Sequence, residues 1–259
     1  MTPQTELDAQ VSQALAYRLT AMGDDELLLG HRNSEWTGHG PVLEEDIALS
    51  NLAQDEIGHA VMWYGVRGEL DGSDADDLAF RRDPAQFLSS TFVELPRGDW
   101  AFTMLRQFLF DCYEAESLPR LARSAHRPLA DAAAKAQREE LFHLRHTGLW
   151  VKRLGLGTDE SHHRSVAALT AMWEAFGALL APLPGDEQLV GAGVLPDWST
   201  LPAAVFARVR AALAAADLDP GEDPVVPPLA QRNTVSEART ELLGTMQAVA
   251  RADPEAVTW

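Results

Sequence analysis

The fold is decided by residues 49–70, which read LSNLAQDEIGHAVMWYGVRGEL. Positions spaced alternately three and four residues apart along this stretch share one face of a helix. The residues on that face are Leu49, Leu52, Glu56, His59, Trp63, Val66 and Leu70. The face is apolar except near its middle, where Glu56 and His59 stand one turn apart. The stretch therefore predicts a long core helix with a Glu-x-x-His pair at its centre.

A second stretch repeats this pattern at residues 133–154, AAKAQREELFHLRHTGLWVKRL. Here Glu140 and His143 stand in the middle of an otherwise mostly apolar face. Two other long helical segments place single carboxylates, Glu26 and Asp111, on faces of the same kind. Four predicted helices therefore carry acidic residues near the middle of their core-facing sides.

Helical periodicity extends through almost the whole chain, and the sequence shows no convincing strand and no phosphate-binding glycine loop. The expected helices cover residues 4–34, 42–70, 84–93, 99–125, 129–154, 159–181, 200–216 and 234–251. Short turns join the first two long helices and the next two, whereas the link between the pairs is long. This pattern predicts an all-α fold, a four-helix bundle with a long crossover. We expect one domain over residues 1–259, with additional C-terminal helices from about 158 to 251.

Composition narrows the class of protein. The chain has 259 residues, 46% of them apolar, and a net charge of −18. This acidity argues against binding to nucleic acid or to anionic membranes, which need a basic surface. One cysteine, Cys112, excludes an intramolecular disulfide and a cysteine-rich zinc site. The sequence shows no apolar signal segment and no membrane span, so we expect a cytoplasmic protein.

The buried acidic residues predict a metal centre. Each unpaired carboxylate in a protein core costs several kcal/mol, so a group of four needs a counter-charge. Two Glu-x-x-His pairs plus one carboxylate from each of two other helices form the ligand set of di-iron and di-manganese carboxylate proteins. The predicted ligands are Glu26, Glu56, His59, Asp111, Glu140 and His143. Oxygen and imidazole donors favour two iron ions, or manganese, over zinc.

Two other features bear on how specific this pattern is. A third Glu-x-x-His pair, Glu160 and His163, lies in a polar segment, so we interpret it as a solvated helix start. Glu114 competes with Asp111 as the third helix's ligand, but Asp111 lies on the apolar face. A hydrogen-bonded polar core, or a site that no longer holds metal, stays open as the alternative.

Two carboxylates adjoin the predicted ligands in the sequence. Asp55 precedes Glu56 and Glu139 precedes Glu140. A carboxylate in such a position can accept a hydrogen bond from the outward nitrogen of a metal-bound histidine on a facing helix. Both residues could equally be ordinary solvated charges on a helix surface.

Several segments resemble a known family. They are residues 29–49 (LGHRNSEWTGHGPVLEEDIAL), residues 82–87 (RDPAQF), residues 143–145 (HLR) and the C-terminal Trp259. In these segments the chain resembles the PaaC-type subunits of the phenylacetyl-CoA ring epoxidase, and the resemblance covers essentially the whole sequence.

The resemblance implies a ferritin-like helical fold and a place in a multi-subunit complex in phenylacetate degradation. In that family the PaaC-type subunit is a structural partner of a related PaaA-type subunit. The PaaA-type subunit holds the di-iron site and epoxidises the ring of an aromatic acyl-CoA with dioxygen. Electrons come from NADPH through a separate reductase. The chain is thus expected to form a hetero-oligomer with a related helical catalytic subunit, or a homo-oligomer.

The chain departs from the PaaC-type pattern at the predicted ligands. PaaC-type chains lack most of them and carry Gln where His59 stands. Residues 54–59 (QDEIGH) and 139–143 (EELFH) instead resemble the PaaA-type motifs. The leading hypothesis is an oxygenase component with its own di-iron site. The alternatives are a non-catalytic structural subunit with a vestigial site, and a ferritin-like iron-oxidising protein.

Overall fold

The computed structural model describes residues 7–255, and all regular secondary structure in this range is helical. The predicted all-α fold is therefore confirmed. The described chain forms two compact units, one of residues 7–14 and 97–230 and the other of residues 15–96 and 231–255. None of the helices in residues 7–255 is long and apolar enough to cross a membrane.

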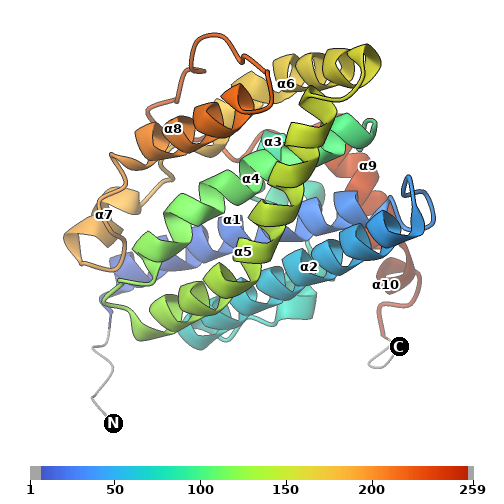
Figure 1. Cartoon of the computed structure of the whole chain (residues 1–259). Coiled ribbons are helices and arrows are strands. Elements are labelled where there is room, and N and C mark those ends of the chain that lie inside the picture. Colours follow the sequence, from blue (N-terminus) through green and yellow to red (C-terminus); the bar gives the residue numbers. More distant parts are fainter. Residues whose placement is uncertain (1–6, 256–259) are drawn as a thin grey trace. The chain divides into compact units, whose positions relative to one another are not determined.

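The unit of residues 15–96 and 231–255 is built on a helical hairpin. Helix α1 (Ala9–Ser34) passes into this unit after residue 14, and α2 (Leu43–Asp71) runs back beside it (Figure 1). The pairing is antiparallel, because Asp24 meets Tyr64 while Gly30 lies against Ala53. A Cβ on Gly30 would stand 2.9 Å from the Ala53 carbonyl oxygen, so glycine permits this close approach.

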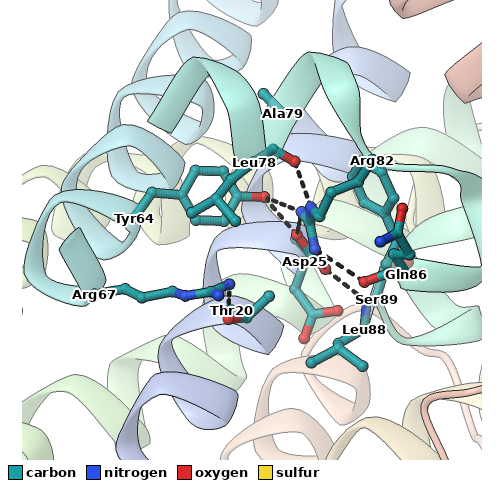
Figure 2. A network of polar contacts seen from close by, with 12 residues as sticks. Thr20, Asp25, Tyr64, Arg67, Leu78, Ala79, Arg82, Gln86, Leu88 and Ser89 are labelled. Carbon is teal, nitrogen blue, oxygen red and sulfur yellow. Dashed lines mark hydrogen bonds and ion pairs between the residues drawn. The ribbon is translucent and has the colours of Figure 1, made fainter. Parts of the chain in front are cut away.

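The link after α2 is packed by side-chain hydrogen bonds. It contains a π-helical turn η1 (Asp77–Arg81), a 3₁₀ turn η2 (Pro84–Gln86) and α3 (Thr91–Glu94). Figure 2 shows Arg82 reaching Tyr64 and the backbone of Leu78 and Gln86. Arg82 also forms an ion pair with Asp24 of α1. These contacts fix the link against the hairpin.

The C-terminal helices α9 (Glu237–Met246) and α10 (Ala248–Ala252) complete this unit. Arg239 is fully buried, and its guanidinium forms an ion pair with Glu94 while donating to the carbonyls of Phe87 and Ser89. Arg232 forms a second buried ion pair, with Asp25 of α1 at 2.8 Å. The C-terminal segment is therefore tied to the link and to α1 by buried ion pairs.

The unit of residues 7–14 and 97–230 contains a second hairpin, made of α4 (Trp100–Leu121) and α5 (Arg127–Gly155). It is also antiparallel, because Trp100 packs edge-on against Trp150 and Thr147 meets Asp111. Helices α6 (Asp159–Leu179) and α8 (Leu201–Ala214) pack against α4 and α5. The short α7 (Asp186–Gly191) lies between them in the sequence. This hairpin is covered mainly by apolar packing.

The predicted long helices agree with the structure to within four residues, except at the N-terminus. There the predicted start at residue 4 is wrong, because residues 7 and 8 are not helical and α1 begins at Ala9. The Asp8 carboxylate accepts hydrogen bonds from the Gln10 and Val11 amides and so caps the helix. Trp259, one of the residues that carry the family resemblance, lies outside the described residues.

Three predictions for the shorter elements are wrong. The single helix expected at 84–93 is split, because the Leu88 and Ser90 amides donate to the carboxylates of Asp24 and Asp25 instead of to helix carbonyls. The helix expected at 234–251 is interrupted at Gln247, whose side-chain amide donates to two carbonyls of the link. The segment between the helices expected at 159–181 and 200–216, where no helix is expected, contains α7, which begins after Gly185 at a φ of 93°.

Candidate metal centre

The hairpin of α1 and α2 brings together three of the predicted ligands. Glu26, Glu56 and His59 are all buried, and each offers a ligand atom within 4.8 Å of the others. The His59 Nδ1 lies 3.8 Å from the Glu26 Oε2. The other Glu26 oxygen accepts a 3.3 Å hydrogen bond from the Trp63 indole. One carboxylate oxygen of Glu26 is therefore held by the protein and the other is directed toward the histidine.

The hairpin of α4 and α5 brings together the other three. The ligand atoms of Asp111, Glu140 and His143 also lie within 4.8 Å of one another, and the three residues are buried. The His143 Nδ1 is 2.8 Å from the Glu140 Oε1. Asp111 is held at both oxygens, since Gln107 donates to Oδ1 at 2.7 Å and Thr147 donates to Oδ2 at 2.5 Å.

Each hairpin thus presents two carboxylates and one imidazole at close range. Two carboxylates within 4.8 Å repel one another in a buried setting unless a cation or a proton lies between them. Carboxylate oxygen and imidazole nitrogen are donors that iron and manganese accept. The donor set in each unit therefore fits a first-row transition metal ion.

The other candidates from the sequence lie outside these groups. Asp55 is exposed and Glu139 is half-buried, and their expected hydrogen bonds to metal-bound histidines stay predictions. Glu114 is buried but does not belong to either group of ligand atoms. Glu160 and His163 are exposed in the first turn of α6, as expected of a solvated helix start.

Sequence reasoning missed the residues that orient the carboxylates. Trp63 and Phe108 each lie one turn from a predicted ligand on the same helix face, and Trp63 donates to Glu26. Gln107 and Thr147 were given no role. A usable signal exists, because Gln107 precedes Asp111 by one helical turn and Thr147 follows His143 by one turn, so each lies on the same helix face as a ligand.

Phe108 instead contributes to a surface groove of about 680 Å³ bordered by α4, α5 and α8. Cys112, one turn further along α4, lines the same groove, and burial raises the pKa of its thiol. A thiol in this state favours the neutral form, which agrees with a packed side chain and not with a metal ligand.

The fold and the two donor sets define a class: an all-helical protein with buried carboxylate–histidine groups on paired helices. Comparison with known proteins assigns the family. The family described as "Phenylacetic acid catabolic protein" matches residues 1–259, and the chain belongs to that family.

Two curated relatives come from Escherichia coli K12. The chain is 35% identical to the C subunit of 1,2-phenylacetyl-CoA epoxidase over 245 residues, which cover 94% of this chain and 98% of the relative. It is 25% identical to the A subunit of 1,2-phenylacetyl-CoA epoxidase over 152 residues, or 59% of this chain and 48% of that relative. The chain is therefore homologous along its length to the C subunit and over a shorter range to the A subunit.

Proposed function

We propose that this chain is a component of a phenylacetyl-CoA epoxidase complex and that it carries its own di-iron centre. Two iron ions would be held by Glu26, Glu56, His59, Asp111, Glu140 and His143, with manganese as the other candidate metal. A related helical subunit would complete the oxygenase, and an external NADPH-dependent reductase would supply electrons. A cytoplasmic location is part of this proposal.

One observation carries the proposal. Both hairpins keep a complete and matching set of buried donors, two carboxylates and one histidine, although the chain matches the C subunit over most of its length. A chain with only a structural role has no need of two such sets, because well-packed apolar residues of similar volume stabilise a core at least as well as buried charges do.

The residues around the ligands would set the geometry of the centre. Gln107 and Thr147 fix the plane of the Asp111 carboxylate, and the Thr147 hydroxyl also lies 2.9 Å from the His143 carbonyl oxygen. Trp63 holds one oxygen of Glu26, and the second lies 3.8 Å from the His59 Nδ1. Such outer contacts commonly change metal affinity by about 10- to 100-fold when they are removed.

When bound, the iron pair would supply the redox chemistry that activates dioxygen for insertion into an aromatic ring. The protein would hold the ligands rigid, keep bulk water away from the metals and position the ring.

The homology to the C subunit favours a second candidate, a structural role in which the donors no longer bind metal. Metal analysis separates the two. Protein produced with added iron should contain close to two iron ions per chain, and the double variant Glu56→Ala/Glu140→Ala should contain none. The matched control is Glu160→Ala/His163→Ala, which alters an exposed Glu-x-x-His pair and should keep the full iron content.

A catalytic test follows the metal analysis. The iron-loaded chain, combined with a PaaA-type protein and the reductase, should consume dioxygen in response to phenylacetyl-CoA, and the double variant in the same mixture should consume less. Iron-free wild-type protein that supports the same rate as iron-loaded protein would leave only the structural role.

A further inference from the structure

Helix α5 has an exposed face that combines apolar and basic side chains. Leu141, Phe142 and Leu149 expose 67%, 71% and 63% of their surface. At 100° per residue these positions fall on one side of the helix. The same side carries five exposed basic residues: Lys135, Arg138, Arg145, Lys152 and Arg153. We call this set of eight residues the α5 basic face.

This face is exceptional in a chain with a net charge of −18, and it contains both lysines of the sequence. Among the described residues, no hydrogen bond or ion pair reaches Lys135, Arg138, Arg145 or Lys152. The one acidic residue on this side, Asp131, is already paired with Arg127. The α5 basic face therefore presents uncompensated positive charge beside apolar surface, which marks interaction sites more often than ordinary protein surface.

Helix α2 has an exposed face of the opposite sign. Its apolar members are Leu43, Ile47 and Val61, exposed by 72%, 54% and 54%. Its charged members are Glu44, Asp55 and Glu69, and no exposed position of α2 between residues 43 and 69 is basic. We call these six residues the α2 acidic face. Gly58 and Gly65 lie on the same side with open space above them, so another backbone can approach closely.

We propose that the α5 basic face of one copy of this chain docks on the α2 acidic face of a second copy. Each face supplies the charge that the other lacks, and both contribute apolar surface to the centre of the contact. The proposal does not depend on a bound metal.

The test is the mass of the full chain in solution, measured by sedimentation velocity at low and at high ionic strength. At low ionic strength we expect a species of at least twice the 28.3 kDa chain mass. A salt concentration of about 0.5 M should shift the equilibrium toward single chains, because charges on exposed faces are screened over a few ångströms.

Charge reversal then locates the contact. Arg138→Glu/Arg145→Glu on α5 should give single chains, and so should Glu44→Arg/Glu69→Arg on α2. An equimolar mixture of these two double variants should regain the larger species. In the mixture, the reversed α5 face of one variant meets the reversed α2 face of the other, and these two faces again carry opposite charges. The control Arg81→Glu/Arg123→Glu changes the net charge by the same amount as Arg138→Glu/Arg145→Glu, at exposed residues outside both faces, and should associate like the wild type.

The apolar part of the contact has its own variant pair. Leu149→Ser should weaken association by about tenfold or more, whereas Val225→Ser, at a residue that is 77% exposed elsewhere, should leave it unchanged. Far-ultraviolet circular dichroism confirms that each variant is folded.

Several outcomes would overturn the proposal. A wild-type chain that stays monomeric at low ionic strength excludes self-docking. The same conclusion holds if this monomeric chain binds anionic vesicles, nucleic acid or a PaaA-type protein through the α5 basic face. Association that survives Arg138→Glu/Arg145→Glu excludes the α5 basic face. A mixture of the two double variants that stays single excludes α2 as its counterpart. None of these results bears on the iron content, so the metal proposal is tested separately.

Discussion

The two hairpins hold the same kind of ligand group by different means. In the α4–α5 hairpin, both oxygens of the Asp111 carboxylate are fixed by neutral donors, Gln107 and Thr147. In the α1–α2 hairpin, one oxygen of Glu26 is fixed by Trp63, at a longer 3.3 Å. The two hairpins therefore orient their carboxylates with different donors, a side-chain amide and a hydroxyl for Asp111 and an indole for Glu26.

The segments that pack against the two hairpins also differ. The α1–α2 hairpin packs against a link in which residues 87–90 are extended, so its backbone groups need side-chain partners. The buried ion pairs Arg239–Glu94 and Arg232–Asp25 belong to that packing. The α4–α5 hairpin packs against the helices α6 and α8, whose backbone groups are hydrogen-bonded within each helix. In this unit the ion pair Arg210–Asp223, which begins on α8, lies at the surface.

The largest expected effect follows from this contrast. Replacing Arg239 by Leu leaves the Glu94 carboxylate buried without its cation and removes donors to three carbonyls. We expect a loss of about 3–5 kcal/mol in the free energy of unfolding. Arg210→Leu breaks an exposed pair and should cost less than about 1 kcal/mol. Urea denaturation measures both, and equal losses would contradict the contrast between the units.

The second effect concerns how the ligands are oriented. Thr147→Val keeps the volume but removes the hydroxyl that donates to Asp111, so iron affinity should fall by about 10- to 100-fold. Trp63→Phe removes a single longer hydrogen bond to Glu26 and should lower affinity less. Competition with a chelator gives both values. As a control, Thr170→Val on the exposed side of α6 should leave iron affinity unchanged. A larger loss of iron affinity for Trp63→Phe than for Thr147→Val would contradict the expected order.

The third effect tests how closely the helices approach in each hairpin. A methyl group on Gly30 would collide with backbone at the Ala53 carbonyl, so Gly30→Ala should destabilise the protein by about 1–3 kcal/mol. At Gly148 the nearest atom would be 3.6 Å away in the Phe108 ring, an ordinary contact. Gly148→Ala should therefore be neutral or stabilise α5 by up to about 1 kcal/mol. Thermal unfolding measures both variants: Tm should fall for Gly30→Ala and should stay the same or rise for Gly148→Ala.

The smallest effect is one of pH. Burial lowers the pKa of His31 on α1 below its ordinary value of 6.5, and the nearby charge of Glu35 opposes this only in part. The unfolded chain therefore binds the proton more tightly, and stability falls as the pH drops below about 6.5. His31→Gln should remove this part of the pH dependence in urea denaturation between pH 7.5 and 5.5.

A carboxylate in the other unit serves as the control for that measurement. Burial tends to raise the pKa of Glu116, but hydrogen bonds and charges from Arg120 and Arg208 outweigh it, so the pKa lies below its ordinary 4.5. The stability that Glu116 contributes is present above pH 4.5 and is lost only at lower pH. Glu116→Gln should thus leave the pH dependence of the free energy of unfolding unchanged between pH 7.5 and 5.5. If Glu116→Gln and His31→Gln changed this dependence equally, His31 would not be its source.

The sequence predicted the long helices and the buried carboxylates and histidines on their faces because both depend on local spacing. Glu56 and His59 share a face for any helix of that sequence, and so do Glu140 and His143. The link could not be predicted in the same way, because Leu88 and Ser90 donate to carboxylates more than sixty residues away. Long-range hydrogen bonds of this kind have no periodic signal, and neither does the donation from Trp63 to Glu26.

We propose that the six predicted ligands, three from each hairpin, hold two iron ions. Mössbauer and EPR spectroscopy of the iron-loaded, oxidised protein test it most directly, together with the iron content per chain. The account predicts close to two iron ions per chain, no EPR signal and Mössbauer doublets of a magnetically coupled ferric pair. An EPR signal from isolated ferric ions, or protein without bound iron, would contradict it.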